Sequence, residues 1–122
     1  MTTVTMTQRA AEFLVSEASG TRSREAVTIA SGNTILAGTV LGKITATGKY
    51  KAYDNDAADG TQAATCIAYD DVDASAGDAL ATVIVRDAEI DQSKLVWGAA
   101  VTTQAEKDAA YVDLAALGII FR

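Results

Sequence analysis

The chain has 122 residues, of which 49% are hydrophobic and 21% charged, so it forms at most one domain and is not a disordered acidic tail. Its net charge of −6 and its scattered basic residues argue against a surface that binds nucleic acid or anionic lipid, because phosphate contacts need clustered Lys and Arg. No apolar run approaches the roughly 20 residues of a membrane span. With one cysteine, no secretion signal and no possible intrachain disulfide, we expect a protein made in a reducing cytosol.

The first 25 residues form a neutral segment that precedes an acidic body. Threonines alternate with Val4 and Met6, and a short apolar cluster follows at Phe13, Leu14 and Val15. The segment has neither the periodicity of a helix nor a clear series of turns. It is either a flexible arm or an ordinary frayed terminus.

From residue 26 onward, short β-prone segments separated by glycines predict a series of short strands divided by turns. Val27 and Ile29 alternate with small residues in a strand that ends at a turn over residues 31–33. Further strands are predicted at residues 38–42, 43–47, 49–53, 65–69, 80–85 and 94–97. Residues 80–85 are the clearest strand and are apolar on both faces, so we expect both faces to be covered by the fold or by a subunit. Because the chain has no proline, its strand edges need charge, bulges or a partner to protect them.

A single helix is predicted near the C-terminus. Thr103 followed by Glu106 is a capping box, and Gly118 provides a left-handed stop. The predicted apolar stripe consists of Ala105, Ala109, Val112 and Ala116. A closing strand follows at residues 119–121. The fold class expected is therefore mainly β with a little α (α+β), a compact small β-barrel or sandwich-like domain with one C-terminal helix.

No arrangement of residues predicts catalysis, a metal or a cofactor. The chain has no histidine, which removes the commonest general base and metal ligand. Cys66 lies inside a predicted strand without a basic neighbour, so a buried structural thiol is expected. The Asp- and Asn-rich loop at residues 54–60 departs from a calcium-binding loop at three ligand or glycine positions. We interpret it, like the acidic loop at residues 70–78, as a solvated turn.

The order of several segments along the chain resembles one protein family. These segments are residues 25–32, 36–44, 50–54, 59–60, 66–68, 76–78, 83–86 and the C-terminal helix followed by residues 117–122. From about residue 12 to the C-terminus, they look like the bacteriophage head decoration proteins, the family of the phage lambda decoration protein. No single motif carries the resemblance, which rests on the ordered set.

The resemblance implies a structural virion protein and not an enzyme. Such proteins bind the outside of the expanded capsid as homotrimers at three-fold and quasi-three-fold positions, where they stabilise the head against packaged DNA. The expected partners are the major capsid protein and further copies of the chain, with synthesis in the host bacterial cytoplasm. Residues 1–25 would be a flexible capsid-binding arm and residues 26–122 a single decoration domain. Within the arm, we expect the capsid contacts to be Val4, Met6, Phe13, Leu14 and Val15.

Three other functions stay open on the sequence alone. A lipoyl- or biotin-type carrier module also has short strands around glycine turns, but Lys43, Lys49 and Lys51 lack the usual surroundings of a modified lysine. A small carboxylate-dependent hydrolase would need a recognisable cleft and nucleophile arrangement. Another virion component, such as a tail or fibre subunit, shares the structural class and differs in location.

Overall fold

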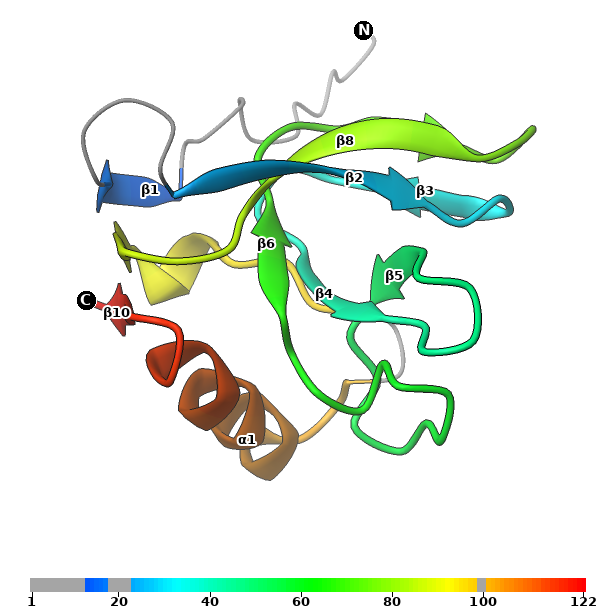
Figure 1. Cartoon of the computed structure of the whole chain (residues 1–122). Coiled ribbons are helices and arrows are strands. Elements are labelled where there is room, and N and C mark those ends of the chain that lie inside the picture. Colours follow the sequence, from blue (N-terminus) through cyan, green and yellow to red (C-terminus); the bar gives the residue numbers. More distant parts are fainter. Residues whose placement is uncertain (1–12, 18–22, 99–100) are drawn as a thin grey trace, which may run out of the picture.

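The computed structural model describes residues 13–17, 23–98 and 101–122. Within these residues the chain is mostly β-structure with one α-helix (Figure 1). The strands are β1 (Leu14–Glu17), β2 (Arg24–Ile29), β3 (Asn33–Ile35), β4 (Val40–Lys43), β5 (Tyr50–Ala52), β6 (Cys66–Ala68), β7 (Val72–Ala74), β8 (Ala79–Ile84), β9 (Ala88–Ile90) and β10 (Ile119–Phe121). A 3-10 helix, η1, spans Gln92–Lys94, and the α-helix, α1, spans Gln104–Ala115.

Five strands close into a barrel in the order β2-β5-β4-β6-β8. Its longest pairing joins β2 to β8 in antiparallel register, from Arg24 opposite Ile84 to Ile29 opposite Ala79. A single parallel contact between Ile29 and Tyr50 closes the barrel between β2 and β5. Closure pairs the barrel strands on both sides, which removes the edges that a chain without proline would otherwise have to protect.

Two smaller sheets lie at opposite ends of the barrel (Figure 1). At one end, β9 is the middle strand between β1, which is antiparallel to it, and β10, which is parallel. At the other end, β3 and β7 form a two-stranded antiparallel ribbon. Helix α1 packs beside β10, below the barrel in Figure 1.

The barrel wall separates two hydrophobic clusters. The inner cluster is made of Ile29, Ile35, Leu41, Cys66, Ala68, Ala74, Ala81 and Val83. The outer cluster fills the space between the wall, α1 and the β1-β9-β10 sheet, and its large members include Phe13, Val40, Tyr53, Ile67, Ile84, Ile90, Leu114 and Ile119. Alternate residues of β4, β6 and β8 therefore point into different clusters, because successive side chains of a strand face opposite sides.

The structure confirms the mainly β fold with a single C-terminal helix. The strands expected at residues 49–53, 65–69 and 119–121 are present, slightly shorter in the first two cases. Residues 43–47 are mostly a turn, and residues 94–97 contain the end of η1 and a single bridge at Val96, so both strand predictions were wrong. Strands β3, β7 and β9 were missed: β7 lies within the loop assigned to residues 70–78, and no strand was predicted over β3 or β9.

The fold itself covers β8 on both faces at only one end of the strand. Val83 and Ile84 are fully buried, one in each cluster. Leu80, by contrast, is 79% exposed, and Thr82 is also exposed. The outer cluster covers the C-terminal end of β8 only, and the start of the strand extends beyond it toward the β3–β7 ribbon.

Helix α1 begins and ends as predicted but buries a different face. The Thr103 side chain accepts a hydrogen bond from the Glu106 backbone N–H, and Gly118 has a φ of 84°. The predicted apolar stripe was wrong, since Val112 is 71% exposed and Ala105 and Ala116 are exposed. The residues that are buried are Ala110 and Leu114, which belong to the outer cluster. Because α1 is rich in alanine, its sequence is compatible with more than one apolar face. Packing of the helix in the tertiary structure determines which face is buried.

Candidate functional site

The residues expected to contact a capsid lie in different environments. Val4 and Met6 are outside the described residues. Phe13 is fully buried in the outer cluster, and Leu14 is partly buried opposite Ile90 of β9. Val15 is 55% exposed, at a bulge where the register of β1 against β9 shifts. Of the described members of the set, Val15 is therefore the one whose side chain is mostly available to another molecule.

The expected arm, residues 1–25, extends further into the chain than the structure supports. Residues 13–17 and 23–25 belong to the folded domain, through β1 and the start of β2. In the free chain Phe13 and Leu14 attach β1 to the domain, and their assignment as capsid contacts stays a prediction. The cause is the pairing of β1 with β9, more than 70 residues away along the chain, which local periodicity cannot reveal.

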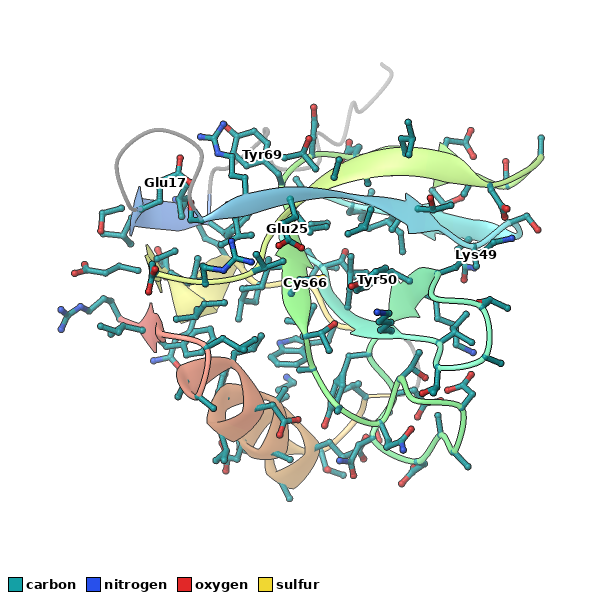
Figure 2. All side chains as sticks on the ribbon, in the orientation of Figure 1. Glu17, Glu25, Lys49, Tyr50, Cys66 and Tyr69 are labelled. Carbon is teal, nitrogen blue, oxygen red and sulfur yellow. The ribbon has the colours of Figure 1, made fainter. Side chains whose placement is uncertain are left out.

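A polar cluster fixes the end of β1 to the start of β2. The Glu17 carboxylate accepts hydrogen bonds from Ser23 Oγ and from Arg24 Nη2, and from Arg24 Nε at 3.1 Å. The Arg24 guanidinium in turn lies over the Tyr69 ring, 4.3 Å from its centroid. Figure 2 shows Glu17 and Tyr69 at the same end of the molecule. Hydrogen bonding to Arg24 lowers the pKa of the Glu17 carboxyl, so the pair is charged at neutral pH.

A groove of about 390 Å³ crosses the β1-β9-β10 sheet. It is lined by Ser16, Glu17, Asp87, Ala88, Glu89, Gly118 and Ile120. Ile120 is 50% exposed and provides the largest apolar surface of the lining. Gly118 lets the turn after α1 lie close to Asp87, the residue before β9, since a Cβ there would lie 2.8 Å from Asp87 Oδ1. Sequence analysis missed this groove because β9 was not predicted, although the alternation of Ala88, Glu89 and Ile90 is typical of a half-buried strand.

The carboxylates of the acidic loops accept hydrogen bonds within turns and form ion pairs. In the loop between β5 and β6, Asp59 accepts hydrogen bonds from Thr61 and pairs with Lys51 Nζ at 2.8 Å. These contacts, led by that with Lys51, lower the pKa of Asp59. Asp71 accepts from the Ala37 N–H at 2.7 Å. Across the described part of the chain, no group of three or more His, Cys, Asp or Glu side chains is placed to hold a metal ion.

The thiol and the lysines that were considered for chemistry have structural surroundings. Cys66 is fully buried in the inner cluster, and burial raises the pKa of its thiol to about 12, which confirms a structural thiol. Lys49 pairs with Asp78 at 2.5 Å, and Lys51 with Asp59. No helix among the described residues is long and apolar enough to cross a membrane.

Comparison with known proteins agrees with the resemblance in the sequence. The model of the family described as bacteriophage lambda head decoration protein D matches residues 3–119. Among the curated proteins, none matches the chain. Because the match spans almost the whole chain, including the barrel, α1 and strands β1 and β9, the protein belongs to the family of the bacteriophage lambda head decoration protein D.

Proposed function

We propose that the protein binds the outer surface of the expanded phage head as trimers at three-fold and quasi-three-fold positions, and there stabilises the shell against the pressure of packaged DNA. The observation that carries this proposal is the family match over residues 3–119. Its partners are the major capsid protein and further copies of the chain. The net charge of −6 suits an outward-facing surface that does not bind DNA.

Within this proposal, residues 1–12 together with Val15 form the capsid-binding arm. The segment is uncharged at its start and carries Val4 and Met6 between threonines, a composition suited to adding a strand to an exposed sheet edge. Backbone hydrogen bonds would then provide most of the affinity. Three arms on one trimer increase the apparent affinity by roughly 10²–10⁴-fold without new contacts.

Strand β1 anchors this arm to the folded domain. Phe13, the first described residue, is buried in the outer cluster, and the contacts of Glu17 with Ser23 and Arg24 hold the other end of the strand. A pull on the arm is therefore transmitted to the barrel through β9 and β2. A decoration protein that resists expansion of the shell needs such a connection, because a load on a loosely attached arm would peel it away.

Sedimentation with purified heads tests the proposal. The protein is mixed with expanded, undecorated heads and, separately, with unexpanded proheads. We expect saturation of expanded heads near one copy per capsid subunit and no binding to proheads. Absence of binding to both would refute the proposal and favour another position in the virion.

An arm deletion tests the assigned surface. Removing residues 2–12 leaves Phe13 in place, so the variant should keep the fold and lose binding to expanded heads. Val15→Lys, which changes an exposed side chain, should weaken binding, whereas Ala58→Lys in an exposed loop is the matched control. An arm-deleted protein that still saturates the heads would contradict the role of the arm.

A further inference from the structure

The loop that joins β5 to β6 contains a dipeptide with its own chemistry (Figure 1). Asp59–Gly60 is the only Asp–Gly in the sequence, which has no Asn–Gly. In an Asp–Gly pair the aspartate side chain can react with the following backbone nitrogen, because glycine has no side chain to hinder the approach. The product is isoaspartate, which inserts a methylene group into the backbone.

Packing against β4 requires glycine at position 60. Gly60 has a φ of 110°, and a Cβ there would collide with Thr45 Oγ1 and with the Lys43 carbonyl oxygen. A second glycine, Gly42 of β4, also permits close contact with the loop, since a Cβ at Gly42 would lie 2.6 Å from Thr61 Cα. The chain therefore cannot avoid isomerisation by placing a larger residue after Asp59, and it has no space for a longer backbone.

Isomerisation proceeds in two steps and needs only water. The Gly60 amide nitrogen attacks Cγ of the neutral Asp59 carboxyl group, the amide proton and the carboxyl hydroxyl leave as water, and a succinimide ring forms. Water then opens the ring: attack at the side-chain carbonyl restores aspartate, and attack at the main-chain carbonyl gives isoaspartate. The ionised carboxylate does not react, because it repels the incoming electron pair and has no hydroxyl to lose.

The Asp59 carboxylate is held in its ionised form on both oxygens. Oδ1 accepts hydrogen bonds from the Thr61 backbone N–H at 3.1 Å and from Thr61 Oγ1 at 2.6 Å. Oδ2 lies 2.8 Å from Lys51 Nζ. Thr61 is fully buried, so its two donors are fixed in position. These contacts, with that of Lys51 the largest, lower the pKa of Asp59 and so reduce the fraction of neutral carboxyl.

The attacking nitrogen and its surroundings are held by other partners. The Gly60 N–H donates to Gln62 Oε1 at 2.7 Å. The Asp59 carbonyl accepts from the Thr45 N–H at 2.8 Å, and the Thr61 carbonyl accepts from the Asp54 N–H at 3.0 Å. Ring closure would have to rotate the carboxyl group away from Lys51 and Thr61 and release the Gly60 N–H from Gln62.

We propose that Asp59–Gly60 is a latent isomerisation site, and that Lys51 and Thr61 keep it as aspartate in the folded chain. The glycine that β4 requires creates the reactive dipeptide, and the two neighbours compensate for it. This inference does not depend on where the protein binds. If the protein functions on a phage head, the same contacts preserve a component that is not resynthesised after assembly.

The rate of isoaspartate formation at residue 59 tests the proposal. Folded wild type, urea-unfolded wild type and Lys51→Met are incubated at neutral pH, and isoaspartate is quantified by enzymatic methylation and located by peptide mapping. We expect folded wild type to react at least about tenfold more slowly than the unfolded chain, because each unit of lowered pKa leaves about tenfold less neutral carboxyl. Folded Lys51→Met should react at least about threefold faster than folded wild type, a modest factor because the ion pair is partly exposed.

Matched variants separate protection of Asp59 from general loosening of the fold. Lys49→Met removes a comparable ion pair, that with Asp78, whose next residue is Ala79, and should leave the rate at residue 59 unchanged. Thr61→Val removes the hydroxyl donor and should accelerate the reaction, whereas Thr61→Ser keeps the hydroxyl and should react like wild type. Trp97 fluorescence verifies that each variant is folded.

The pH profile gives a readout that loosening alone would not move. The rate decreases as pH rises above the pKa of Asp59, so this decrease should occur at higher pH in Lys51→Met than in wild type. Equal rates for folded and unfolded wild type would overturn the proposal. A folded Lys51→Met that reacts no faster than Lys49→Met, with an unchanged pH profile, would also overturn it.

Discussion

Replacing Phe13 by alanine tests whether β1 belongs to the folded domain. Phe13 is fully buried in the outer cluster. A buried phenylalanine removes roughly 150–250 Å² from water, or about 4–6 kcal/mol at about 25 cal/mol per Å². Phe→Ala substitutions in cores cost about 3–5 kcal/mol, because the remaining alanine retains some burial and the cavity partly collapses. We therefore expect Phe13→Ala to lower the free energy of unfolding by about 3–5 kcal/mol, a large part of the roughly 5–15 kcal/mol typical of a domain.

The single tryptophan reports this unfolding directly. Trp97 packs edge-on against Tyr53 and Tyr111, with ring centroids 6.3 and 5.7 Å apart, so its fluorescence follows the outer cluster. Urea unfolding is compared between wild type, Phe13→Ala and the control Val15→Ala. Since Val15 is 55% exposed, the control should change stability by less than about 0.5 kcal/mol. A Phe13→Ala variant as stable as this control would refute the integration of β1 and restore a free arm that continues through residue 17.

Three further predictions concern single groups. Glu17→Gln should destabilise the protein by about 1 kcal/mol at neutral pH, as it removes the charge that Arg24 contacts. Because the folded-state pKa of Glu17 is lowered, its contribution to the free energy of unfolding is present above the unfolded-state pKa and is lost as pH falls through the folded-state pKa. Urea titrations at a series of pH values should therefore show the stability difference between Glu17→Gln and wild type shrinking in acid. A difference that does not change with pH would contradict this reasoning. Cys66 should resist a thiol reagent in the native protein and react once urea unfolds it, since it is fully buried and its pKa is raised to about 12; rapid native labelling would argue against a closed barrel interior. Thr103→Ala should cost about 1 kcal/mol by removing the cap of α1, measured by thermal unfolding, whereas Thr102→Ala, an exposed neighbour, should be nearly neutral; equal effects of the two changes would exclude the cap as the cause.

The candidate site was accessible from the sequence only in part. The composition of residues 1–15 indicated a neutral arm, and the order of segments along the chain indicated the family. The family match confirms the second of these predictions, the family. The groove was not foreseen, because its lining comes from β1, β9 and the end of α1 with β10, which are distant in sequence. Leu80 was expected to be covered by the fold or by a subunit, since its strand is apolar on both faces, and nothing local distinguishes its exposed end from its buried end.

The sequence by itself determined the features that depend on residues close together along the chain. The cap at Thr103, the left-handed Gly118 and the buried thiol of Cys66 follow from local hydrogen bonding, backbone conformation and the absence of an activating neighbour. Tertiary structure alone decided that Phe13 enters the core, that α1 buries Ala110 and Leu114, and that the barrel closes between β2 and β5. Each of these outcomes depends on contacts between segments far apart along the chain, whose free energy comes from shared burial and exists only once the segments meet.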